Sequence, residues 1–139
     1  MKITFLGTGT SQGVPVIACD CEVCFSKEAK DKRLRSSILI EDKGKVIVVD
    51  TGYDYDEATR RDRPIQRSPS EALKAINIDA SEVTDVIITH LHYDHAGGLM
   101  EFPKAKFHMQ EVEMAYATGP CMCHDTIQMP FTGEHVCQM

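Results

Sequence analysis

The feature that most constrains the fold is a run of metal-binding side chains directly after an apolar stretch. The run is His90-Leu91-His92-Tyr93-Asp94-His95, and Val86-Ile87-Ile88 lies just before it. Because side chains repeat every second residue along a strand, a strand ending here directs His90 and His92 to the same side. Asp94 and His95 fall where the chain must turn. Zinc, iron and manganese accept imidazole and carboxylate ligands, so the run predicts two neighbouring metal sites. A histidine-rich loop without metal is the alternative.

The spacing of these four residues is similar to the H-x-H-x-D-H signature of the metallo-β-lactamase superfamily. The similarity extends back to Val48-Val49-Asp50-Thr51-Gly52 and forward through Ala96-Gly97-Gly98-Leu99. The resemblance implies that His90 and His92 hold one ion, and that Asp94 and His95 hold the other. It also implies that Asp50 lies beneath the metal loop and orients it without binding metal. The expected cofactor is Zn²⁺, two per complete site, with Fe, Mn or Co as alternatives.

Two branches of the superfamily are represented. Residues 50–131 resemble the N-acyl-homoserine lactonases, through Thr51-Gly52-Tyr53-Asp54, the Leu-His-Tyr-Asp-His-Ala-Gly-Gly form of the motif and Cys121-Met122-Cys123-His124. Residues 1–49 are similar to the cyclic-phosphodiesterase branch, through the glycine-rich segment 5–15 and the cysteines after it. A junction near residue 50 is therefore predicted, and a natural mosaic, a chimera and an assembly error are all open.

Three cysteines, Cys19, Cys21 and Cys24, lie within six residues. A structural zinc site takes four ligands, usually Cys or His, so this cluster is one ligand short of closure. The resembling phosphodiesterases hold a structural zinc with such a cluster and a distant histidine. A zinc site that braces the loop is the favoured interpretation, and free surface cysteines are the alternative.

The resemblance implies an α/β (α+β) fold, the four-layer αββα sandwich of the superfamily. A complete site there also needs a third histidine, a bridging aspartate and a last histidine, all from the second half of the fold. The expectation is therefore a single domain over residues 1–139 that forms the N-terminal half only. Its sheet would leave one apolar face in water, which predicts self-association.

Local patterns predict strands over residues 2–6, 37–41, 45–49, 85–89 and 104–109, and helices over 70–76, 99–102 and 111–117. Val46 to Val49 is an apolar run typical of a strand buried on both faces. Lys27 to Arg35 is strongly charged and is expected to be a solvated connection. His108 and Tyr116 are interpreted as packing residues. The glycine-rich loop 7–13 is predicted either to pass near the metal pocket or to be a plain structural turn.

The composition of the chain limits which kinds of partner and which compartment are expected. The formal net charge of −6 argues against nucleic acid. No stretch approaches the ~20 apolar residues of a membrane helix, and six cysteines without a secretory signal favour the cytoplasm. The predicted function is metal-dependent hydrolysis of a small-molecule ester or lactone by a hydroxide between two ions, with Asp94 carrying the proton. Phosphodiester hydrolysis and a catalytically incompetent zinc-binding fragment are the alternatives.

Overall fold

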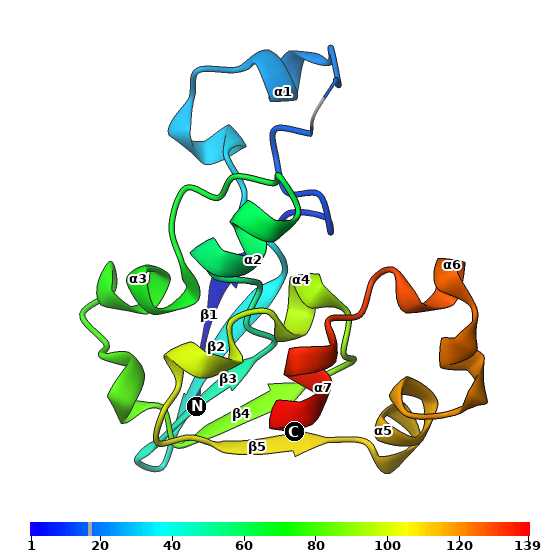
Figure 1. Ribbon diagram of the computed structural model, residues 1–139. Helices are drawn as coiled ribbons and strands as arrows, with labels where there is room; N and C mark the ends of the chain where they lie inside the picture. Colours follow the sequence, from blue (N-terminus) through cyan, green and yellow to red (C-terminus); the bar gives the residue numbers. More distant parts are fainter. Residues whose placement is uncertain (17) are drawn as a thin grey trace.

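The computed structural model describes residues 1–16 and 18–139, and a five-stranded mixed sheet forms its centre (Figure 1). The strands are β1 (Lys2–Gly7), β2 (Ser37–Asp42), β3 (Lys45–Val49), β4 (Asp85–Ile88) and β5 (Lys106–Met109), and they lie in that order across the sheet. The first three pair antiparallel, whereas β3, β4 and β5 run parallel. All five expected strands are therefore present, with ends shifted by at most two residues.

Short helices connect and cover the strands. They are α1 (Glu22–Phe25), α2 (Tyr55–Arg60), α3 (Pro69–Lys74), α4 (Tyr93–Ala96), α5 (Glu111–Ala117), α6 (Asp125–Gln128) and α7 (Gly133–Gln138), with 3₁₀ turns η1 (Ala29–Asp31), η2 (Ala80–Glu82), η3 (Leu99–Glu101) and η4 (Pro120–Cys123). Figure 1 shows α2, α3, α4 and α7 on one side of the sheet, while α1 sits on an arm that projects away from it. In the described part of the chain, no helix is long and apolar enough to cross a membrane.

Local chemistry explains the boundaries. Lys43 and Gly44 join β2 to β3 with φ angles of 47° and 79°, the left-handed conformation that two-residue hairpin turns require. Ser68 caps α3 in a reciprocal capping box with Glu71, and Pro69 occupies the first turn. These signals are readable in the sequence, and the structure confirms both the hairpin and the helix.

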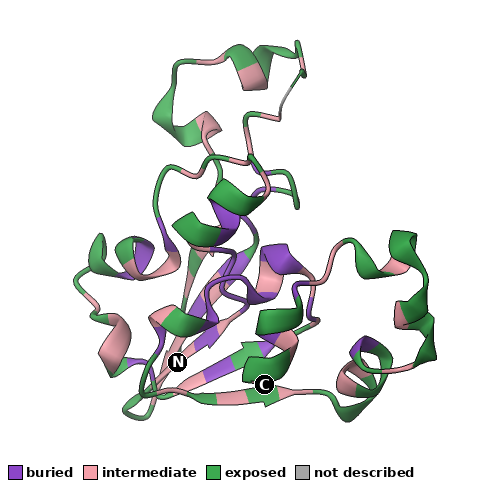
Figure 2. Ribbon diagram, viewed as in Figure 1, coloured by how far each residue is buried: buried purple, intermediate pink, exposed green. Residues whose placement is uncertain are grey.

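One face of the sheet forms the core, and Figure 2 shows buried segments gathered over the middle of the sheet. Leu39, Val48, Val86 and Ile88 are almost fully buried and pack with Leu73, Leu91, Leu99 and Phe102 from the covering segments. α7 closes this layer, since Val136 and Met139 pack against the same cluster. Burial of these side chains, at roughly 25 cal/mol per Å² of apolar area, is the main stabilisation of the chain.

The opposite face of the sheet is apolar and uncovered. Strand register places Phe5 beside Ile38, Ile38 beside Val49, and Val49 beside Ile87. Phe5 is 71% exposed and Ile87 38% exposed. The expectation that Val46 to Val49 is buried on both faces is therefore wrong, because only Val48 in that run is buried. An apolar run shows that both faces of a strand can be buried, but not that both are covered. Among the described residues, no segment covers this face of the sheet.

Four smaller expectations need correction. Lys27 to Arg35 is not simply solvated, since Arg35 is buried. His108 is exposed and bonds to Asp85 across the strand pair, with 2.8 Å between Nε2 and Oδ1. Tyr116 is likewise exposed. The helix expected over 99–102 is the 3₁₀ turn η3, and α4 is a separate helix that ends before the glycine pair. For Arg35 and His108, contacts with distant segments, which local periodicity does not show, decide the outcome.

Candidate metal centre

Strand β4 and helix α4 present the motif side chains together. β4 ends at Ile88, and His92 is the N-cap residue of α4. The imidazole of His90 lies between two others, with ring centroids 4.5 Å from His92 and 3.9 Å from His95. Asp94 is buried, and its Oδ2 lies 3.3 Å from Nε2 of His95. The structure thus brings all four predicted residues to the carboxyl end of β4, where α/β sheets place their functional groups.

Asp50 supports this cluster from the end of β3. Its carboxylate accepts hydrogen bonds from the backbone N–H of Thr89 at 2.8 Å and from the Thr89 hydroxyl at 2.7 Å. It also lies 2.8 Å from Nδ1 of His95. Such a contact fixes the ring orientation and tautomer of a histidine, which is what an outer carboxylate does at metal sites.

The charges of the cluster suit divalent cations. Burial and the neighbouring imidazoles lower the pKa of His90, and burial also lowers that of His92, so both rings are neutral near pH 7. Burial is the largest single influence on Asp94 and opposes its ionisation, but hydrogen bonding to His95, the charge of His95 and smaller contributions together hold the pKa at about 2. Burial likewise disfavours the charged form of His95, yet Asp50 and Asp94 raise its pKa to about 9. Neutral imidazole and ionised carboxylate are the forms that bind metal. His90, His92 and Asp94 are in those forms near pH 7, whereas His95 is protonated in the metal-free chain and would release a proton on binding an ion.

The loop after β3 holds the motif in place. The backbone N–H and the hydroxyl of Thr51 both donate to the carbonyl of His95, at 2.7 and 2.9 Å. Gly97 pairs with Tyr53 so closely that an added Cβ would lie 2.4 Å from the Tyr53 Cβ. Glycine at this position is therefore required by packing between the two loops.

The C-terminal segments also touch the motif. The Glu113 carboxylate on α5 accepts a 2.8 Å hydrogen bond from the backbone N–H of Leu91. The ring of Phe131 packs edge-on against His92, with centroids 4.9 Å apart. Nothing in the sequence pattern pointed to either residue, because both contacts join segments over twenty residues apart.

The glycine-rich loop passes near the motif. This agrees with the first of its two predicted roles, a loop beside the metal pocket, rather than a plain structural turn. The Ser11 side chain lies near the Asp94 carboxyl and contributes to its lowered pKa. The buried Arg35 guanidinium holds this loop, with Nε donating to the Ser11 carbonyl at 3.3 Å and Nη2 donating to the Gln12 carbonyl at 3.0 Å. Arg35 therefore lies near the site, although the many charged residues around it in the sequence predicted that this segment is exposed.

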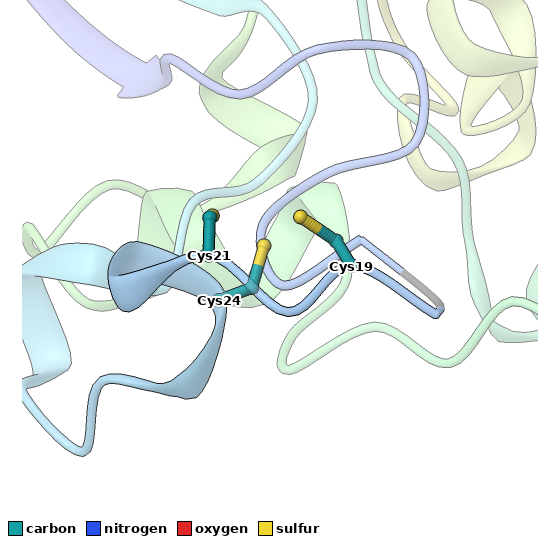
Figure 3. Close-up of side chains that lie close together, drawn as sticks. All are labelled: Cys19, Cys21 and Cys24. Carbon is teal, nitrogen blue, oxygen red and sulfur yellow. The ribbon is translucent and has the colours of Figure 1, made fainter.

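The three cysteines gather on the projecting arm, where Figure 3 shows Cys19, Cys21 and Cys24. Their sulfur atoms all lie within 4.8 Å of one another, and within the described residues this is the only set of three or more potential ligands so close together. All are free thiols. Hydrogen bonding from the Cys24 backbone is the main cause of a lowered Cys21 pKa. The trio supplies three donors suited to zinc, and its metal occupancy remains a prediction.

The comparisons with known proteins agree with this geometry. The sequence pattern of the metallo-β-lactamase superfamily matches residues 31–132. The chain therefore belongs to the metallo-β-lactamase superfamily. The predicted α+β fold of the superfamily and the predicted similarity to both lactonases and phosphodiesterases are confirmed.

Individual relatives point in several directions. An octanoyltransferase of Porphyromonas gingivalis is 38% identical over 111 residues, which is 79% of this chain and 19% of that protein. An N-acyl homoserine lactonase of Rhizobium johnstonii is 40% identical over 50 residues, 36% of this chain and 19% of its own. Among solved structures, a diphosphatase of the PhnP family is 35% identical with a TM-score of 0.55, covering 73% of this chain and 34% of that chain. The chain thus spans about a fifth of the curated relatives and a third of this solved structure.

Proposed function

We propose that this chain supplies half of a di-metal hydrolase site, in which His90, His92, Asp94 and His95 are the ligands it contributes. The observation that carries the proposal is the convergence of these four side chains on the end of β4, with Asp50 bonded to both Thr89 and His95. Two ligands per ion are too few for tight binding, since catalytic zinc takes three protein ligands. Full activity therefore needs ligands besides these four.

The chemistry of the chain's own residues follows from their environment. Divalent ions, when bound, would activate water and polarise the substrate carbonyl or phosphoryl oxygen. His90 and His92 offer neutral nitrogen donors from one side of the strand end. The Asp94 carboxyl has a pKa of about 2 and is therefore ionised near neutral pH. It is available both as a metal ligand and as a proton carrier beside the reacting atoms. Asp50 holds His95 in one orientation throughout.

A lactone or related ester is the proposed substrate. The lactonase relative matches this chain at 40% identity over 50 residues, and the resemblance through residues 50–131 includes the motif and both of its flanks. Phosphodiester hydrolysis is the second candidate. It is favoured by the diphosphatase similarity, at 35% identity over 73% of this chain, and by the glycine-rich loop beside Asp94.

A substrate panel separates the two candidates. A protein carrying this chain, supplied with Zn²⁺, is assayed with N-hexanoyl-homoserine lactone and with bis-p-nitrophenyl phosphate. Lactone opening that is lost in Asp94→Asn and kept in Asp42→Asn is the expected result. Phosphodiester hydrolysis without lactone opening would refute the lactone assignment, and hydrolysis of neither would contradict the enzyme assignment.

A further inference from the structure

We propose that a hollow between the glycine-rich loop and the segment after α2 is an oxyanion subsite, in which Arg35 and Arg63 bind a phosphate or carboxylate group of the substrate. This inference rests on the proposed function, because the hollow adjoins the candidate metal centre. It adds a substrate property that the motif alone does not imply, namely a charged group at a distance from the bond that is cleaved.

The hollow is lined by two arginines and is large enough to hold a phosphate or carboxylate group together with part of a larger molecule. Its volume is about 390 Å³, and Gln12, Pro15, Val16, Arg35, Arg63 and Pro64 line it. A neighbouring hollow of about 290 Å³ shares Arg35 and adds Lys32 and Arg33. Neither lining contains an acidic residue. In Figure 1 the two contributing segments, residues 9–16 in blue and 61–67 in green, approach each other below the arm.

The two guanidinium groups have no carboxylate at salt-bridge distance among the described residues, and the more distant charge of Asp94 acts on Arg35 but does not outweigh its burial. Within the described residues, neither Arg35 nor Arg63 has a carboxylate oxygen within 4.0 Å, whereas Arg60 and Arg61 both pair with Glu57. Arg35 is only 7% exposed. Burying a cation without a partner is costly, and a second cation nearby adds repulsion. An oxyanion between them would relieve both costs.

The geometry of Arg35 leaves donors for a ligand. Its Nε and Nη2 are used on the carbonyls of Ser11 and Gln12, and its plane lies over the Tyr53 ring at 4.3 Å. Of its five N–H groups, those on Nη1 have no hydrogen-bond acceptor among the described residues. Arginine binds phosphate and carboxylate through such paired donors.

The hollow also lies next to the motif. Ser11, whose carbonyl accepts a hydrogen bond from Arg35, has its side chain close enough to Asp94 to lower the pKa of that carboxyl. Arg63 lies over the ring of Tyr93, the residue before Asp94, at 5.8 Å. An anionic group bound by the two arginines would therefore sit beside the candidate metal ligands.

The test is anion binding by the metal-free chain. Inorganic phosphate and, separately, acetate are titrated into the EDTA-treated 139-residue protein by calorimetry. We expect saturable binding of at least one anion, weakened about 10-fold in Arg63→Gln because a charge-assisted bond is lost. Arg67→Gln removes the same charge from an exposed position outside both hollows and should change affinity by less than about twofold. Tighter binding of phosphate would indicate a phosphorylated substrate, and tighter binding of acetate a carboxylate-bearing one.

A second variant guards against misfolding. Arg35→Lys keeps the buried charge but removes the paired donors, so its affinity should fall while its circular dichroism spectrum is retained. The proposed subsite would be overturned if neither anion bound, or if Arg63→Gln and Arg67→Gln lost the same amount of anion affinity. Because no metal is present, this result is independent of the substrate panel and does not depend on hydrolysis.

Discussion

The Asp50 carboxylate lies 2.8 Å from Nδ1 of His95, although the two residues are 45 positions apart. Asp50 directly follows β3 and has a left-handed φ of 55°, which turns its side chain under the loop after β4. The same carboxylate holds the Thr89 backbone and hydroxyl. A single side chain thus ties the parallel strand pair β3–β4 to the orientation of a candidate metal ligand.

Asp50→Asn tests this role with little change in shape, because asparagine also tolerates the left-handed conformation. Replacing one acceptor oxygen with an amide should lower unfolding free energy by ~1–3 kcal/mol and weaken metal binding ~10–100-fold. Urea denaturation and zinc titration measure the two effects. Asp42→Asn at the hairpin is the control. Equal behaviour of the two variants would show that Asp50 does not orient His95.

The buried Glu57 carboxylate should be a stability centre. It pairs with Arg61 and accepts a 3.0 Å hydrogen bond from the Thr132 hydroxyl, which joins α2 to the segment before α7. Arg61→Leu removes the bonded partner and leaves Arg60, 3.4 Å from the other carboxylate oxygen, as the remaining arginine partner. The change should therefore cost ~1–3 kcal/mol. Arg67→Leu, at an exposed position, should cost less than ~0.5 kcal/mol. Similar melting temperatures for the two variants would contradict this account.

The uncovered sheet face should make the isolated chain self-associate. Phe5→Ser removes one of its most exposed apolar side chains and should shift sedimentation toward the monomer. Val112→Ser removes an apolar side chain that is 75% exposed on α5, away from this face, and should leave self-association unchanged. A monodisperse, cooperatively melting wild-type monomer would refute the prediction.

The capping box of α3 should be sensitive to acid. Hydrogen bonds from the Tyr55 hydroxyl and the Ser68 backbone lower the pKa of Glu71 below the ordinary value of 4.5 for a glutamate. Its contribution to stability is therefore present above pH 4.5 and is lost as the pH falls through the lower folded value. Carbon-detected NMR titration should show this pKa rising in Tyr55→Phe and unchanged in Tyr116→Phe. No rise in Tyr55→Phe would contradict the assigned cause.

Local signals predicted the elements well, because each carries its own chemistry. The turn at Lys43-Gly44, the cap at Ser68 and the apolar run before His90 are all set by neighbouring residues. Burial and long-range pairing were predicted less well. Arg35 was expected in solvent, and His108 in a packed position, because whether a side chain is covered depends on segments far along the chain. Glu113 and Phe131 reach the motif for the same reason, and no local pattern could have indicated them.

In the proposed centre, the motif supplies two metal ligands to each of two ions. Cobalt titration tests it most directly, in a Cys19→Ser/Cys21→Ser/Cys24→Ser variant that lacks the thiolate site. The account predicts a weak, substoichiometric visible band that is lost in His92→Ala and kept in His108→Ala. Two tightly bound equivalents would contradict the incomplete ligand set, and a band indifferent to His92→Ala would contradict the assignment of the motif.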